Sequence, residues 1–292
     1  GMIWPGPEKF PEIDASRRVK LCYRSLIGGM LRQMITPANW KYILYRANIL
    51  ARTLENDWGV TECLNQLPGS PEFSIEGTTA ETGKRFRFQR ETLGEYSVGY
   101  ADSGSFPLAE AMAVSAAFPG GIGPLKLDAR AYYWRSHSKA EKAGRKVCPY
   151  DTLHLYDGGI YDNLGLEPFF DAGSASPKNT DAFLIVSDAG AAFRYGFSYT
   201  TLNPLRLKRV LDVVMEQCRS LRVRGICRYF TQNPGSGTYL WINTSLRSHP
   251  GNEERLFAST FPTTLRRLTY EEFDRLAQYG YWVAAERIRL GA

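Results

Sequence analysis

Apolar residues recur at helical spacing near the start of the chain and give way to shorter alternating runs further on. From about Leu21 to Gly59 they fall three or four positions apart, which predicts helices, and Pro37 predicts a break between them. Residues 1–19 are polar and rich in proline, so we expect a flexible lead-in there.

Two alternating runs then predict a β-hairpin. Phe73 and Ile75 alternate with polar residues, and Phe86 and Phe88 do the same after a Thr-Gly pair at 82–83. Alternation with period two is typical of half-buried strands, and a Thr-Gly pair suits the turn between them.

An alanine-rich segment predicts a short helix over residues 108–117. Ser105 is expected as its N-cap, Pro107 lies in its first turn, and Pro119 with two glycines ends it. So many small side chains indicate that another element packs closely against this helix. Residues 129–150 show no period and predict a loop.

The second half alternates strands and helices. Strands are expected in TLHLYDGG (152–159), DAFLIVSDAG (181–190) and GTYLWINT (237–244). A long helix begins at Asn203 as cap and Pro204, with one apolar face made of Leu207, Leu211, Val214, Cys218 and Leu221.

A final helix opens on a capping box of Thr269 and Glu272. Alternation of strands and helices over most of the chain predicts an α/β fold with a mainly parallel sheet and helices on both faces. One domain over residues 20–292 is expected.

Composition narrows the class of protein. The chain has 292 residues, 43% hydrophobic and 23% charged, with a net charge of +6 that favours an anionic surface. The densest basic cluster, in Arg219, Arg222, Arg224 and Arg228, is interpreted as a solvated face, and no nucleic-acid partner is expected. The five cysteines lack C-x-x-C spacing, so reduced thiols in a cytoplasm are expected, without a metal site.

Three ordered motifs resemble the C-terminal part of a patatin-like phospholipase domain. They are T-G-x-x-x-x-F at 82–88, the alanine-rich helix closed by Pro119, and Asp157-Gly158-Gly159 followed by Asp-Asn. The resemblance covers roughly residues 25 to 289, and LIVSDAG and GYWVAAERI resemble longer bacterial members.

The resemblance implies acyl-ester hydrolysis by a Ser–Asp dyad, without cofactor or metal. Asp157 would be the dyad carboxylate, which helps to remove the serine proton. Gly158 and Gly159 would form the motif turn, and Gly158 would allow a close approach of substrate. A lipid or ester substrate and peripheral contact with a membrane follow from the same resemblance.

The nucleophile is unknown, because no G-x-S-x-G elbow occurs in the chain. Ser25 is a weak substitute, and Ser115 is better explained by helix packing. We therefore expect a patatin-like domain that is incomplete at its N-terminus, with self-association or a partner chain supplying the missing segment.

Three alternatives stay open. The chain could be an inactive patatin-like module that binds lipid or protein. Asp157, Asp162 and Asp188 could instead gather a divalent cation. The Asp157 motif could also be a plain turn, as is preferred for Asp188 with Gly190, and the Asp162-Asn163 pair is expected to shape a turn.

Overall fold

The described residues of the computed structural model form two compact units. They are residues 25–136, 144–193, 195–196, 205–247 and 252–291. The N-terminal unit spans Leu26–Gly165, and the C-terminal unit contains the described residues from Leu166 onward. The predicted lead-in over residues 1–19 lies outside the described residues, and a single domain over residues 20–292 stays a prediction.

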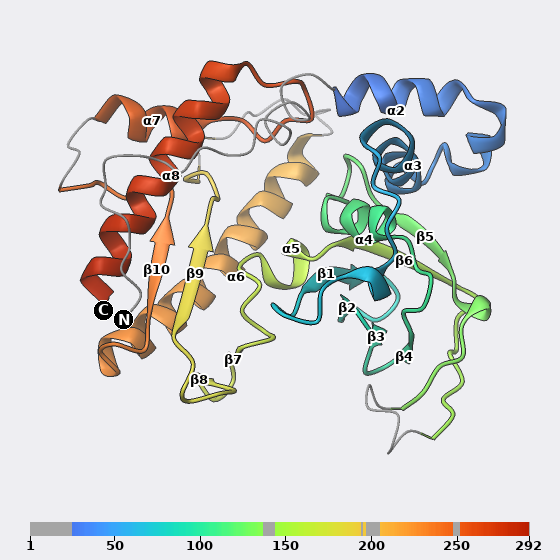
Figure 1. Ribbon diagram of the computed structural model, residues 1–292, viewed down its shortest axis with the longest axis horizontal. Helices are drawn as coiled ribbons and strands as arrows, with labels where there is room; N and C mark the ends of the chain where they lie inside the picture. Colours follow the sequence, from blue (N-terminus) through green and yellow to red (C-terminus); the bar gives the residue numbers. More distant parts are fainter. Residues whose placement is uncertain (1–24, 137–143, 194, 197–204, 248–251, 292) are drawn as a thin grey trace. The chain divides into compact units, whose positions relative to one another are not determined.

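The N-terminal unit is built on one six-stranded antiparallel sheet (Figure 1). Its order is β4-β3-β2-β1-β6-β5, and every neighbouring pair runs antiparallel. The strands are β1 (Ser74–Thr79), β2 (Arg85–Gln89), β3 (Thr92–Glu95), β4 (Gly99–Asp102), β5 (Leu125–Asp128) and β6 (Thr152–Asp157). The predicted hairpin is confirmed as β1 and β2.

The prediction of a mainly parallel sheet with helices on both faces is wrong. Residues 90–91 join β2 to β3, and residues 96–98 join β3 to β4. Links this short connect only antiparallel neighbours, since a parallel connection needs a crossover of a dozen or more residues. Among the described strands, the parallel pair is the small one formed by β9 and β10 in the C-terminal unit.

Helices of the N-terminal unit stack in layers on this sheet. The structure has α2 (Leu26–Ile35), η1 (Pro37–Tyr42), α3 (Arg46–Trp58), η2 (Leu64–Gln66), α4 (Leu108–Ser115), η3 (Ala129–Ala131) and α5 (Gly159–Asp162). Helix α2 packs on α3, α3 packs on α4, and α4 packs on β1 and β6. The predicted break at Pro37 is confirmed.

The packing of α4 explains why this helix is rich in alanine. Ala109, Ala111 and Ala113 are buried between α3 and the sheet, which confirms the predicted close packing. The expected N-cap is wrong, because Pro107 occupies the N-cap position and Ser105 lies exposed before it. Fully buried Phe86, Phe88, Leu93, Leu125, Leu153 and Leu155 form the sheet's contribution to the core.

One residue on the outer edge of β5 is paired by a side chain of α3. The amide of Asn48, on α3, donates from Nδ2 to the carbonyl of Lys126 at 3.2 Å. Its Oδ1 accepts the N–H of the same residue at 2.8 Å. Asn48 therefore pairs with Lys126 as a residue of a neighbouring strand would.

The C-terminal unit contains β7 (Phe170–Asp171), β8 (Ser176–Pro177), β9 (Leu184–Asp188), α6 (Leu205–Gln232), β10 (Gly237–Trp241), α7 (Asn252–Thr260) and α8 (Tyr270–Gly291) (Figure 1). Helices α6 and α8 both contact β10. Its core cluster consists of Leu240, Leu246, Ala258, Tyr279 and Val283. The capping box of α8 is confirmed, since the Glu272 N–H donates to Thr269 Oγ1 at 3.1 Å and the Thr269 N–H donates to Glu272 Oε2 at 2.9 Å.

The predicted long helix is confirmed as α6, but part of its predicted apolar face is exposed. Val214 is 52% exposed and Leu221 is 62% exposed, and Cys218 is exposed too. Periodicity shows that a helix has an apolar stripe but does not show what covers it. Asn203, Pro204 and the side chain of Leu207 lie outside the described residues.

No helix of the described residues is both long and apolar enough to cross a lipid bilayer.

Candidate functional site

Asp157 is the last residue of β6 and is held by three neighbouring segments. It lies opposite Gly77 of β1, and its carbonyl accepts the hydroxyl of Thr78 at 2.9 Å. Its N–H donates to the carbonyl of Ala117, just beyond α4, at 3.1 Å. These contacts fix the backbone of Asp157 where β1, β6 and the end of α4 meet.

The carboxylate of Asp157 is held by its own turn. Its Oδ1 accepts the N–H of Gly159 at 2.7 Å. Among the described residues this is the hydrogen bond that the carboxylate receives, so Oδ2 is left for another donor. Burial raises the pKa of Asp157, and the Gly159 hydrogen bond opposes the shift only in part.

Glycine is required at two positions beside this carboxylate. A Cβ on Gly158 would lie 2.7 Å from the carbonyl oxygen of Glu76 and 2.8 Å from its carbonyl carbon. A Cβ on Gly77 would lie 2.5 Å from Cγ1 of Val114 on α4. Since directly opposite residues of an antiparallel pair share a face, the Asp157 side chain lies on the α4 side of the sheet.

A second carboxylate lies next to this turn. Glu76 accepts the Ser74 hydroxyl at 2.7 Å and lies 3.4 Å from Nε of Arg85. Burial raises the pKa of Glu76, although Ser74 and Arg85 lower it. Two carboxyl groups with raised pKa values therefore belong to adjacent strands at the Asp157 turn.

The motif continues into a second local turn. Oδ1 of Asp162 accepts the N–H of Leu164 at 3.2 Å, which confirms the predicted turn at Asp162-Asn163. Asp162 is buried and Asn163 is exposed. The sequence motif thus folds as two consecutive turns around the one-turn helix α5.

No serine of the described residues donates a hydrogen bond to Asp157. Ser25 is exposed directly before α2, and Ser115 is exposed at the last residue of α4. Ser103 donates to the carbonyl of Arg90 at 2.5 Å and is buried, as expected for a turn residue. The carboxylate half of the predicted dyad has a defined place, and its nucleophile stays unknown.

The C-terminal unit contains a buried network that sequence reasoning missed. Oδ1 of Asp188 accepts the Gly190 N–H at 2.8 Å, as the turn prediction expected. Its Oδ2 accepts Nη1 of Arg219 at 2.6 Å and the hydroxyl of Tyr239 at 2.5 Å. Arg219 also pairs with Glu216 at 2.9 Å.

This network corrects the interpretation of the basic cluster. Only 12% of the Arg219 side chain is exposed, and Arg222 pairs with Glu167 at 3.3 Å, so these two arginines are not part of a solvated face. The Glu216 hydrogen bond raises the pKa of Arg219, and burial followed by the Asp188 hydrogen bond raises that of Tyr239. The only sequence signal was an Asp at the end of an apolar strand.

Other candidate ligands have ordinary explanations. Nδ1 of His154 lies 2.6 Å from Oε1 of Glu81, and the ring stacks on Tyr45. The described cysteines are free, and Cys22 lies outside the described residues. Across the part of the chain that the structure describes, no three His, Cys, Asp or Glu side chains gather as a metal site, so a cation held by Asp157, Asp162 and Asp188 gains no support.

Comparison with protein-family models gives no match to this chain, and comparison with curated proteins gives none either. The resemblance to patatin-like phospholipases therefore rests on the three ordered sequence motifs alone.

Proposed function

We propose that Asp157 is the general base of a patatin-like acyl-ester hydrolase. The observation that supports the proposal is a carboxylate at a strand end, fixed by backbone contacts, with a pKa raised by burial. A base works best when its pKa lies close to the working pH, so the direction of this shift favours proton transfer.

The serine in this proposal comes from a G-x-S-x-G segment, which this chain does not contain. As the serine Oγ attacks the ester carbonyl, its proton passes to Oδ2 of Asp157. The alcohol leaves with that proton, and an acyl-serine forms. Water then attacks the acyl group and gives a proton to Asp157, which passes it to the serine Oγ as the fatty acid leaves.

Fluorophosphonate labelling tests the proposal. The chain is labelled alone and after co-expression with a second polypeptide that carries a G-x-S-x-G segment. We expect an adduct on the serine of that segment, and about 100-fold slower labelling with Asp157→Asn, since a general base contributes about 10²–10⁴-fold. The exposed Asp151→Asn serves as control. Equal labelling of both variants would contradict the proposed role.

A second candidate function is binding to an anionic membrane surface, and α2 with η1 favours it. Ile27, Leu31 and Ile35 recur every four residues along α2 and are 46%, 60% and 76% exposed. Trp40, Ile43 and Leu44, which follow α2 in the chain, are also at least half exposed, from 50% to 78%.

The basic residues of this segment also favour contact with an anionic membrane. The segment Leu26–Arg46 contains Arg32, Lys41 and Arg46 and has no acidic residue, although Arg32 pairs with Asp57 of α3 at 2.5 Å. Apolar and tryptophan side chains flanked by basic residues are typical of helices that lie in the headgroup region of anionic bilayers.

Co-sedimentation with phosphatidylserine vesicles at low salt tests this candidate. We expect binding that falls at least about tenfold in Leu31→Glu/Ile35→Glu, because two carboxylates enter the apolar row. Vesicles of phosphatidylcholine alone are the control for charge. Velocity sedimentation without lipid tests the predicted self-association. If the double variant bound as well as the original chain, this surface would not be the membrane contact.

A further inference from the structure

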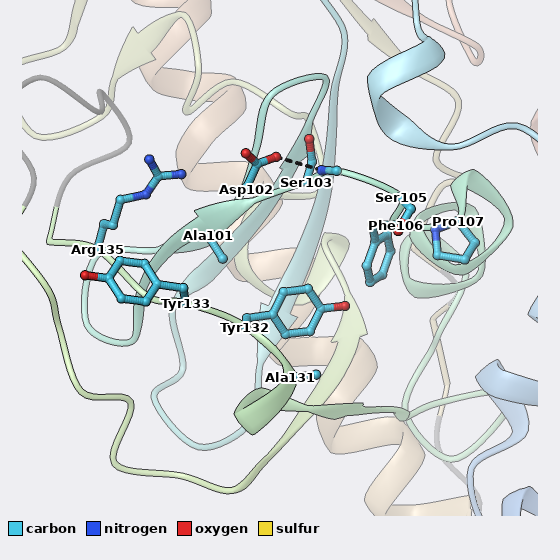
Figure 2. Close-up of a pocket in the computed structure, with 11 residues that line it drawn as sticks. Ala101, Asp102, Ser103, Ser105, Phe106, Pro107, Ala131, Tyr132, Tyr133 and Arg135 are labelled. Atoms are coloured by element: carbon cyan, nitrogen blue, oxygen red, sulfur yellow. Dashed lines mark hydrogen bonds between the residues drawn. The ribbon is translucent and has the colours of Figure 1, made fainter.

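The N-terminal unit contains a cavity of about 510 Å³ that the proposed hydrolase site does not use (Figure 2). Its walls come from the end of β4, the loop before α4, and the segment after η3. Asp157 is not among its lining residues. The volume lies within the range of small-molecule pockets, about 300–1,000 Å³.

Aromatic side chains form the apolar walls. Phe106 is buried at one side, and Tyr132 and Tyr133 present their rings along another (Figure 2). Burial raises the pKa of Tyr132 to about 12, so its hydroxyl stays protonated at neutral pH and can donate a hydrogen bond. Such walls suit a flat ring, which gains from stacked or edge-on contact with aromatic neighbours.

Arg135 supplies the cation of the cavity lining. Its backbone pairs with Tyr100 through hydrogen bonds of 2.9 and 2.8 Å, which fixes the start of the side chain. Arg135 lines the cavity, and its planar guanidinium can bind a carboxylate through two parallel hydrogen bonds.

Asp102 supplies the opposite charge. It is exposed at the end of β4, and its Oδ1 accepts the N–H of Gly104 at 2.8 Å (Figure 2). One guanidinium and one carboxylate give the lining no net charge, so a dianion such as phosphate would be repelled by Asp102. A ligand with one carboxylate and one ammonium matches both groups.

We propose that this cavity binds a small aromatic ligand carrying both a carboxylate and an ammonium group, as a free aromatic amino acid does. Arg135 binds the carboxylate, Asp102 binds the ammonium, and Tyr132 and Tyr133 contact the ring. The proposal is independent of the acyl hydrolase and of any serine nucleophile.

Titration calorimetry with L-phenylalanine as the probe tests the site. Hydrocinnamate lacks the ammonium group and phenethylamine lacks the carboxylate. We expect phenylalanine to bind with a Kd below about 1 mM, and each analogue to bind at least about tenfold more weakly. Hydrocinnamate binding as tightly as phenylalanine would overturn the role of Asp102.

Variants separate the contacts. Arg135→Gln should weaken phenylalanine binding at least about tenfold. Asp102→Asn keeps an acceptor for the Gly104 N–H and should weaken it several-fold. Tyr133 is exposed, so Tyr133→Ala removes one aromatic ring of the cavity wall without disturbing the core. Arg130→Gln is the control, because Arg130 pairs with Asp128 and does not line the cavity. No binding to the folded chain, or equal binding by all variants, would overturn the proposal.

Discussion

A carboxylate such as Asp157 links its protonation to the stability of the fold. Burial raises its pKa above the ordinary value of 3.8. The folded state therefore holds the proton more strongly than the unfolded state does. As pH rises from that ordinary value through the folded pKa, the free energy of unfolding falls, and the loss persists at higher pH.

Asp157→Asn should remove this pH-dependent loss. The amide keeps an oxygen that can accept the Gly159 N–H, so the turn is preserved. We expect the free energy of unfolding of Asp157→Asn, relative to the original chain, to increase as pH rises from about 4 toward neutrality. Urea unfolding at a series of pH values measures it, with Asp151→Asn as control for the change in net charge. A difference that is constant with pH would contradict the raised pKa.

Gly158 offers a test of the close approach at the same turn. A Cβ there would meet the backbone of Glu76 at 2.7 Å, which cannot move aside as a flexible side chain could. Gly158→Ala should lower the free energy of unfolding by about 1–3 kcal/mol.

Gly225→Ala is the matched control for that substitution. Gly225 lies within α6, and a Cβ on it would meet no side chain and no other element within 4 Å. The same change should therefore raise the free energy of unfolding by about 0.5–1 kcal/mol, because alanine favours the helix. Equal effects of the two substitutions would show that Gly158 has room for a side chain.

At the scale of elements, α6 is tied to β9 and β10 by the buried Asp188 network. Arg219→Leu would leave Asp188 with a buried charge and only part of its hydrogen bonds. We expect a loss of about 3–5 kcal/mol in the free energy of unfolding. Arg228→Leu, on the exposed side of the same helix, should change it by about 0.5 kcal/mol or less. Denaturant titration of both variants checks this difference.

Elements with a strong local signal were predicted correctly from the sequence. Alternating Phe73 and Ile75 with Phe86 and Phe88 marked the hairpin, and Thr269 with Glu272 marked the start of α8. In contrast, β3 and β4 were missed. Their buried apolar residues are Leu93 and Ala101, and glycines occupy other positions, so no period is visible. Without these two strands, the remaining alternation favoured a parallel sheet.

For the whole molecule, contacts between residues far apart in the sequence could not be predicted. The position of Asp157 at a strand end followed from the apolar run before it. Its contacts with Ala117 and Gly77 depend on segments about 40 and 80 residues earlier, and such contacts leave no local pattern. Arg219 belonged to a basic cluster in sequence, although its partner Asp188 lies on β9, about 30 residues earlier.

Asn48 connects one side chain to the behaviour of the whole molecule in concentrated solution. Asn48→Ala would leave the N–H and carbonyl of Lys126 without their amide partner. We expect a loss of about 1–3 kcal/mol in the free energy of unfolding and faster, concentration-dependent growth of thioflavin-positive aggregates. Asn48→Gln is the control, because it keeps the amide group but places it one CH₂ group further from the helix. Aggregation unchanged in Asn48→Ala would show that the edge is protected by other means.

The pairing of Asn48 with β5 gives the protein its own protection against intermolecular strand addition at this position. A strand edge with free amides is a template on which foreign polypeptides can add, layer upon layer. In the folded molecule, Nδ2 and Oδ1 of Asn48 pair with the carbonyl and the N–H of Lys126 on this edge. The side chain of Asn48 thus occupies the backbone groups of Lys126 with which a strand from another molecule would otherwise pair.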